Sequence, residues 1–217
     1  MEEEDSSNLI ERKTQDFDDY PLPCDRIISE LPSVTQRYYE PRFYVPKLTR
    51  KVPVECHIGH QIVLFHNNRI GVVTLAPNHP LITNDSEIES LDFQVTDKTN
   101  RLDNKVSGKW KKGGQRVDQN SLLCVASCED GSSYAIFSCM RGTLIEINEK
   151  LFTDPNILRK KPWSEGYVAI IFPFAKTFKI EKDNLMSWAD YKIFQSQANQ
   201  IEEDEDVKQE VKSDTTN

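Results

Sequence analysis

One cysteine and three histidines lie close together in the chain and are the first candidates for metal chemistry. They are Cys56, His57, His60 and His66. A structural zinc ion takes four such ligands, usually from two closely spaced pairs. Here His66 would have to be the fourth ligand, and it is expected at a turn after a strand. We favour a strand edge and its approach loop for these side chains and keep zinc as the alternative.

Two further sites for sulfur or acid–base chemistry are weaker. Cys124 and Cys128 are four residues apart, which puts both side chains on one side of a strand and suits packing as well as a metal. No Cys-x-x-Cys pair supports redox chemistry, and the odd total of five cysteines favours reduced thiols. His79 is a candidate base, but no nucleophile or carboxylate pattern surrounds it.

The segment 98–116 holds seven bases and one acid among glycines, and is predicted to be a loop or a short strand. Its order of lysines and glycines is not that of a phosphate-binding loop. We interpret it as a contact surface for an acidic partner, with an ordinary solvated loop as the alternative. The candidate partner-binding residues are Lys105, Lys109, Trp110, Lys111 and Lys112.

The elements that position these residues are mostly strands. Apolar and β-branched runs predict two hairpins, 61–75 and 122–137, and single strands at 91–95, 142–147 and 166–171. Asn67-Asn68 predicts a type I′ turn in the first hairpin, and Asp130-Gly131 predicts the turn of the second.

Two helices complete the prediction. Asp154 and Pro155 are typical of a helix start, and Pro162 of an end, so a short helix is expected near 155–161. Ser187 and Asp190 form a capping pattern before an apolar stripe, which predicts a C-terminal helix near 187–200 packed across the strands.

Charge divides the chain into three parts. The formal net charge is -8, yet residues 1–20 carry eight acids and two bases, and residues 202–217 carry seven acids and two bases. The intervening part is therefore mildly basic. We predict an acidic disordered tail over 1–33, one domain over 35–200, and a second acidic disordered tail over 202–217.

The N-terminal residues lack the basic and apolar regions of a secretory signal and are too acidic for a mitochondrial presequence. No apolar run approaches the ~20 residues of a membrane-spanning helix, so no membrane association is expected. The segment 34–53 interleaves aromatic and basic residues, and we expect the aromatics to cover an edge of the domain, with base stacking as the alternative.

A spaced set of residues resembles the H-protein family of the glycine cleavage system. The resemblance implies a mainly β, barrel-sandwich hybrid fold of the lipoyl and H-protein type. Arg159 and Tyr167 depart from the family's asparagine and tryptophan. The matching residues are Gly142, Glu146, Asn148, Leu151, Pro155, Pro162, Glu165 and Gly166.

The same resemblance bears on carrier chemistry. In H proteins the lipoylated lysine lies at a hairpin tip, eleven residues before the glycine that matches Gly142. That place is Gly131 here, and no lysine occurs from Gly113 to Glu149. A lipoyl arm needs an amine to form its amide, so the resemblance implies the fold without the carrier function.

A second resemblance, from about Arg37 to Tyr191, is to the Abitram family of actin-binding transcription modulators, also called Simiate. It is carried by the segments 37–44, 66–76, 101–114, 138–149 and 163–171. It implies binding to actin, as monomer and filament, and a role in polymerisation and in filopodia and neurite dynamics. It also implies a transcriptional role and a location in the nucleus, including speckles, in the cytoplasm and in cell projections such as lamellipodia, growth cones and dendrites.

The sequence therefore predicts a non-enzymatic actin-binding protein with no catalytic residue, metal or cofactor. A nucleic-acid or ribonucleoprotein adaptor, acting through the basic segment 98–116, is the first alternative. A lipoyl-type carrier is the second, and the residue at position 131 argues against it.

Overall fold

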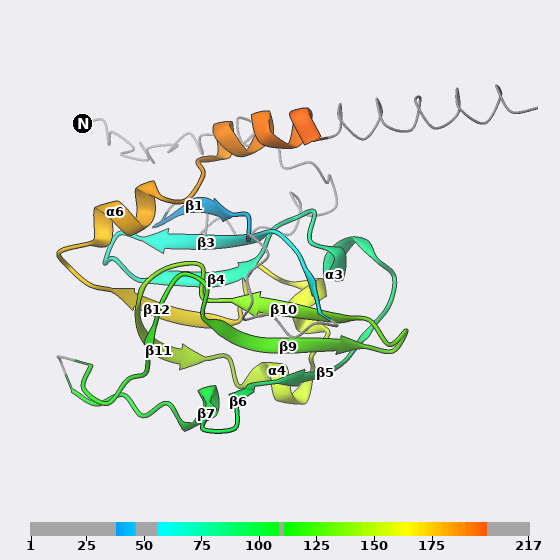
Figure 1. Cartoon of the computed structure of the whole chain (residues 1–217), viewed down its shortest axis with the longest axis horizontal. Coiled ribbons are helices and arrows are strands. Elements are labelled where there is room, and N and C mark those ends of the chain that lie inside the picture. Colours follow the sequence, from blue (N-terminus) through cyan, green and yellow to red (C-terminus); the bar gives the residue numbers. More distant parts are fainter. Residues whose placement is uncertain (1–37, 47–55, 109–110, 199–217) are drawn as a thin grey trace, which may run out of the picture.

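The computed structural model describes residues 38–46, 56–108 and 111–198. Its largest part is an antiparallel sheet in the order β1-β3-β4-β12-β11-β8 (Figure 1). The strands are β1 (Tyr39–Tyr44), β3 (Gln61–His66), β4 (Gly71–Leu75), β12 (Ala169–Pro173), β11 (Gly142–Ile147) and β8 (Arg116–Val117).

A second sheet packs against the first in the order β2-β10-β9-β5, and a short two-stranded sheet pairs β6 with β7. These strands are β2 (His57–Ile58), β10 (Ser133–Phe137), β9 (Leu122–Cys128), β5 (Ile88–Asp92), β6 (Gln94–Thr96) and β7 (Thr99–Asn100). The helical elements are short: α3 (Pro80–Thr83), η2 (Arg101–Asp103), α4 (Lys150–Thr153), α5 (Ile157–Lys160), α6 (Phe178–Asp183) and the helical residues 188–198.

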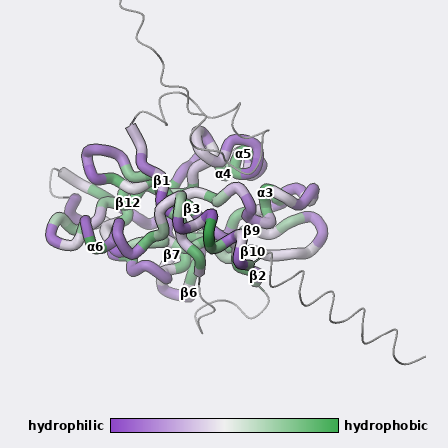
Figure 2. Tube along the Cα trace, turned by 90° about the horizontal axis from the view of Figure 1, so that it is seen from above, coloured by the Kyte–Doolittle hydropathy of each residue, from purple (hydrophilic) through white to green (hydrophobic). Residues whose placement is uncertain are grey.

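The two faces of β3 explain how the layers are held. Val63 and Phe65 point into the main core, which also takes buried residues from β9, β10, β11 and β12. Ile62 and Leu64 point to the other side and join a second buried cluster. Successive strand residues alternate between the two faces of a sheet. Both faces of β3 carry apolar residues because each face is covered by a buried cluster. Figure 2 shows hydrophobic positions near the middle of the sheets and hydrophilic positions in the surrounding loops.

The C-terminal helix covers the outer face of the large sheet, as predicted (Figure 1). Tyr191 stacks on Phe43 of β1 with ring centroids 4.1 Å apart, and Trp188 lies 5.2 Å from the same ring. The predicted cap is present, because the Asp190 amide donates to Ser187 Oγ at 3.2 Å. Across the described ranges, none of the helices combines the length and apolarity needed to cross a bilayer.

Several predictions were wrong in detail. The single strand expected at 91–95 is instead parts of two strands, β5 (Ile88–Asp92) and β6 (Gln94–Thr96). In the first hairpin the positive φ falls on Arg69, at 74°, and not on Asn67 or Asn68. The short helix α5 begins at Ile157, because Pro155 lies in the turn that precedes it, and α4 forms a separate turn before that. Strand β12 starts at Ala169, three residues later than expected.

In the described part of segment 34–53, two of the four aromatic residues are buried as expected, whereas Tyr38 is half exposed. Phe43 and Tyr44 are buried, and the Tyr44 hydroxyl donates to Asn120 Oδ1. Arg42 stays at the surface side and pairs with Glu40 at 2.7 Å. The predicted tails 1–33 and 202–217 lie outside the described residues, so the domain boundaries remain a prediction.

Candidate functional site

The basic segment forms a small hairpin. Ser107 and Lys112 exchange both backbone hydrogen bonds, at 2.9 and 3.0 Å, and the Lys111 amide donates to the Gly108 carbonyl at 3.1 Å. The side chains of Lys105, Lys111 and Lys112 are exposed. Lys109 and Trp110, the other two candidate residues, lie outside the described residues. The structure therefore brings three of the predicted lysines to one projecting turn.

Three polar side chains attach the base of this hairpin to the domain. Asn104 donates through Nδ2 to the Leu144 carbonyl at 3.0 Å and accepts from the Gln115 amide at 2.8 Å. Arg101 is buried and donates from Nη1 to Gln115 Oε1 at 2.8 Å. Asn104 and Gln115 therefore fix the base of the hairpin to the domain, and the lysines project from this attached base.

Further cations lie at the same end of the molecule. Arg116 and Arg141 are exposed and lie over the ring of Phe174, at 5.8 and 6.0 Å from its centroid. The exposed Lys176 precedes α6 and the exposed Lys179 lies in it, and α6 occupies the same end as the basic hairpin in Figures 1 and 2. This end therefore presents several cations from separate elements.

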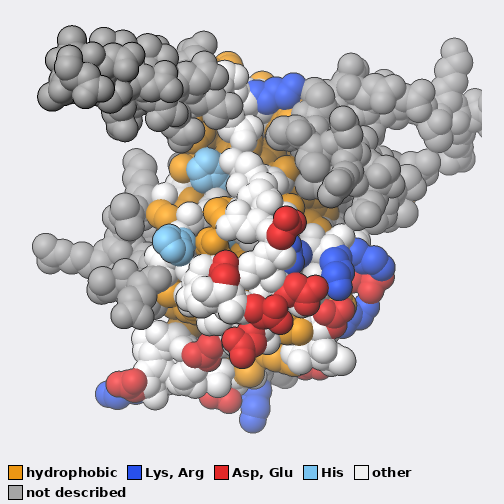
Figure 3. All heavy atoms as spheres, turned by 90° about the vertical axis from the view of Figure 1, so that its right-hand side faces the viewer, with side chains coloured by type: hydrophobic (Ala, Val, Ile, Leu, Met, Phe, Trp, Pro, Cys, Tyr) orange, Lys and Arg blue, Asp and Glu red, His pale blue; other side chains and the backbone are white. Residues whose placement is uncertain are grey.

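The opposite end is acidic. The Glu129 amide donates to the Glu87 carbonyl at 3.1 Å, so the turn between β9 and β10 lies beside the segment that precedes β5. Both residues are exposed, as are Asp85 and Asp130. Figure 3 shows Asp and Glu side chains gathered in a band across this face, with Lys and Arg side chains beside it. The basic hairpin and the acidic turn thus lie at opposite ends of the described part of the molecule (Figure 1).

The four candidate zinc ligands do not converge. His60 precedes β3 and contacts Tyr191, whereas His66 ends β3 and contacts Tyr39. Six residues of extended chain separate them by about 20 Å, far beyond the span of one zinc ion. Within the described ranges, no group of three or more His, Cys, Asp or Glu side chains is placed to hold a metal. Cys124 and Cys128 are buried in the main core instead.

His79 and His60 are held by contacts with neighbouring elements of the fold. His79 is fully buried, and its Nδ1 accepts from the Leu81 amide at 3.1 Å at the start of α3. Burial lowers the pKa of His79 to about 3, and burial also lowers the pKa of His60. His60 Nδ1 lies 2.7 Å from the hydroxyl of Tyr191, which donates to Asn78 Oδ1 at 2.5 Å. His60 therefore connects the C-terminal helix to the loop before α3, and His79 is closed off from solvent.

By the resemblance to H proteins, the turn between β9 and β10 corresponds to the turn that carries the lipoyl lysine in that family. Gly131 occupies this turn with φ at 81°, and the Gly131 amide donates to the Cys128 carbonyl at 3.0 Å. The exposed neighbours are Glu129 and Asp130. The tip thus offers carboxylates where carrier chemistry requires an amine.

Comparison with known proteins supports the two sequence resemblances. The family model of the glycine cleavage H-protein matches residues 93–198. Protein Abitram of Xenopus tropicalis is 39% identical over 168 residues, which cover 77% of this chain and 88% of that protein. The chain belongs to the Abitram family.

A further relative shows a similar identity and coverage. Protein Abitram of Homo sapiens is 38% identical over 161 residues, covering 74% of this chain and 86% of that protein. Among solved structures, a glycine cleavage system H protein from Mycobacterium marinum aligns over 71% of this chain and 96% of that chain, at 12% identity and a TM-score of 0.45. The match of the H-protein family model and the observed strands confirm a mainly β, H-protein-like fold with a C-terminal helix.

Sequence reasoning found the lysines of the basic hairpin but missed the residues that anchor it. Arg101, Asn104 and Gln115 were expected only as part of a polar loop. Arg101 donates to the Leu122 carbonyl and Asn104 to the Leu144 carbonyl, and both carbonyls are distant in the sequence. A single sequence carries no signal for such contacts, although an arginine before an Asp-Asn pair is compatible with them.

Proposed function

We propose that this protein is a non-enzymatic actin-binding protein that regulates actin polymerisation and the dynamics of filopodia and neurites. A transcription-modulating role in the nucleus, including nuclear speckles, belongs to the same proposal, with a second population in the cytoplasm and cell projections. Family membership and the earlier resemblance support the class of function. The observation that carries the proposal is the rigidly supported hairpin with Lys105, Lys111 and Lys112 exposed.

The basic end suits an acidic protein surface. Actin is an acidic protein, and complementary charges accelerate encounter and orient the partners. The hairpin base is attached through Asn104, so the backbone there needs less ordering on binding than an unattached loop would, which reduces the entropic cost of association. The acidic turn at the other end would repel the same surface, and this favours one orientation.

A nucleic-acid or ribonucleoprotein adaptor is the second candidate function, since lysine side chains also contact phosphates. The same exposed lysines favour it. The two candidates differ in what the partner must present: carboxylates on a folded protein, or phosphates at regular spacing.

The proposed absence of carrier function rests on the residue at the second hairpin tip. Gly131 has no side chain that a lipoyl group can acylate. The test is the intact mass of the protein after co-expression with a lipoyl ligase, with a true H protein as the positive control. We expect an unmodified mass, and an increase equal to one lipoyl group would contradict the proposal.

Actin binding is tested with the purified full-length chain. We expect it to co-sediment with actin filaments and to change the fluorescence of labelled monomer, with both signals weakening as salt screens the charges. Single-stranded RNA and duplex DNA of equal charge are titrated in parallel. Tighter binding to nucleic acid than to either form of actin would favour the adaptor, and binding to neither would overturn the assignment of the basic hairpin.

A further inference from the structure

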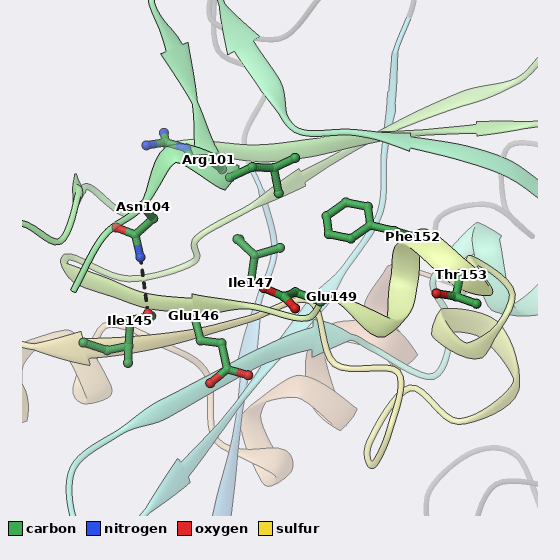
Figure 4. A pocket seen from close by; sticks show the side chains of 9 residues that line it. Arg101, Asn104, Ile145, Glu146, Ile147, Glu149, Phe152 and Thr153 are labelled. Carbon is green, nitrogen blue, oxygen red and sulfur yellow. Dashed lines mark hydrogen bonds between the residues drawn. The ribbon is translucent and has the colours of Figure 1, made fainter. Parts of the chain in front are cut away.

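A pocket of about 580 Å³ lies beside the base of the basic hairpin, and none of the roles described above uses it. Two stretches of chain form it: η2 with the residues that follow, and the end of β11 with α4 (Figure 4). Asn104 belongs to both features, because its side chain lines the pocket and donates to the carbonyls of Leu144 and Ile145. The volume is within the range of binding pockets in proteins.

One side of the pocket is apolar although it faces solvent. Leu102 and Phe152 are 47% and 46% exposed, and they are two of the five exposed large apolar side chains in the described ranges. Figure 4 shows Phe152 and Ile147 directed toward the middle of the pocket. Phe152 is held edge-on against the buried Phe93, with ring centroids 5.3 Å apart. A fixed apolar patch of this kind marks an interaction site more often than a scattered exposed leucine does.

The charged groups of the pocket leave a negative excess. Glu146 and Glu149 line it, and Arg101 is the only cation among the described residues that line it. The Arg101 guanidinium is turned to the side away from Phe152 and donates to the Leu122 carbonyl at 3.0 Å and to Gln115 at 2.8 Å (Figure 4).

The carboxylates themselves are not neutralised. Glu146 accepts a hydrogen bond from the Tyr167 hydroxyl at 2.7 Å, which leaves its charge in place. Among the described residues, no lysine or arginine forms a salt bridge with Glu146 or Glu149; the neighbouring Lys150 pairs with Glu165 instead. Both glutamates are exposed at the rim.

We propose that this pocket binds a cationic side chain, lysine or arginine, presented by a segment of a protein partner. Such side chains combine an apolar stem with a charged head. The stem would lie on Leu102, Ile147 and Phe152, with the ring of Phe152 also able to attract the cation through its face. The head group would meet the carboxylate of Glu149, because the Glu146 side chain is directed to the other side of β11 from Ile147 and Phe152 (Figure 4).

The proposal is independent of actin binding through the basic hairpin. The pocket requires a cationic group on its partner, whereas the hairpin requires an acidic surface. A variant that loses the exposed lysines of the hairpin should keep the pocket's binding, which allows the two proposals to fail separately.

The test is a titration followed by methyl NMR of the full-length protein, with Leu102, Ile145 and Ile147 as reporters. The probes are the N-acetyl, N-methylamide forms of lysine, arginine and norleucine. We expect saturable shifts with lysine or arginine in the millimolar range and much weaker ones with norleucine, which has the stem without the charge. Absence of shifts with both cationic probes, or equal shifts with norleucine, would overturn the proposal.

Variants localise the effect. Glu149→Gln removes charge at the rim and should weaken binding of the cationic probes by about twofold to fivefold, as for an exposed ion pair. Leu102→Ala shortens the exposed apolar side and tests the stem without touching the Phe93–Phe152 contact. Glu129→Gln, on the distant acidic turn, is the matched control and should bind as the wild type does. Equal weakening by Glu149→Gln and Glu129→Gln would show a general charge effect and contradict a local site.

Discussion

Two hairpins project from opposite ends of this molecule, and their charged side chains have opposite signs. The turn between β9 and β10 has Gly131 at its tip with Glu129 and Asp130 beside it, whereas the hairpin 107–112 presents lysines. By the resemblance to H proteins, the first corresponds to the turn that carries the modified lysine in that family. The comparison teaches that one H-protein-like fold presents carboxylates and a glycine at this turn and lysines at the other hairpin.

The two hairpins also differ in how they are held. Strands β9 and β10 belong to a sheet, and their residues Leu123, Ala126 and Ile136 are fully buried in the main core. Among its described residues the hairpin 107–112 is closed by three backbone hydrogen bonds, and its base depends on the side chains of Asn104 and Gln115. One hairpin is therefore part of the cooperative core, and the other is a local structure attached to it.

The largest effect is expected in the core hairpin. Leu123→Ala in β9 removes a fully buried side chain, and such changes lower the free energy of unfolding by about 2–5 kcal/mol. At this chain length a loss of ~3 kcal/mol corresponds to a melting temperature about 6–12 °C lower, measured by circular dichroism. A change below ~1 kcal/mol would show that β9 is not part of the cooperative unit.

A smaller and more local effect is expected at the base of the basic hairpin. Asn104→Ala removes the donor to Leu144 and the acceptor for the Gln115 amide, at a cost of about 1–3 kcal/mol. Hydrogen exchange of the Ser107 and Lys112 amides should accelerate while the amides of β9 and β10 stay protected. Acceleration in both hairpins would mean that the basic hairpin is not a separate unit.

The smallest stability effects come from a matched pair of glycines. Gly131 and Gly108 have φ values of 81° and 66°, and an added Cβ would meet nothing within 4 Å at either position. Alanine in this backbone region costs about 1–2 kcal/mol. Gly131→Ala should lower the melting temperature, whereas Gly108→Ala should loosen only residues 107–112. Equal falls in melting temperature would remove the distinction between the hairpins.

Local sequence patterns predicted the elements whose determinants are local. Gly142–Ile147 alternates and is β11, and Asp130-Gly131 predicted the turn that Gly131 makes with positive φ. The turn after β3 was predicted through Asn67-Asn68, but Arg69 takes the positive φ because the loop is longer than a two-residue turn. Local propensity identified the turn and not its register.

The residues that build the functional surface were less predictable. The lysine cluster is visible in the sequence as charge, but its presentation depends on Asn104 reaching the carbonyl of Leu144, 40 residues away. Arg101 was expected in a loop and is buried, since its donors find Leu122 and Gln115 only after folding. The pocket beside it combines residues 101–104 with 145–153, and this juxtaposition follows from topology rather than from any local pattern.

The central claim is that the basic hairpin is the actin contact, and one paired measurement tests it most directly. In the test variant Lys105, Lys109, Lys111 and Lys112 are all changed to glutamate. In the control variant four exposed lysines elsewhere, Lys150, Lys160, Lys161 and Lys192, are changed to glutamate, so that the net charge of the two proteins is identical. Circular dichroism verifies that both are folded.

Filament co-sedimentation at low salt then compares the two variants with the wild type. Reversal of four contact charges should weaken binding by at least about tenfold in the hairpin variant, whereas the control should change little because its lysines lie outside the contact. Equal binding by the hairpin variant and the wild type would contradict the account and move the actin contact to another surface, with the segment 37–50 as the next to test.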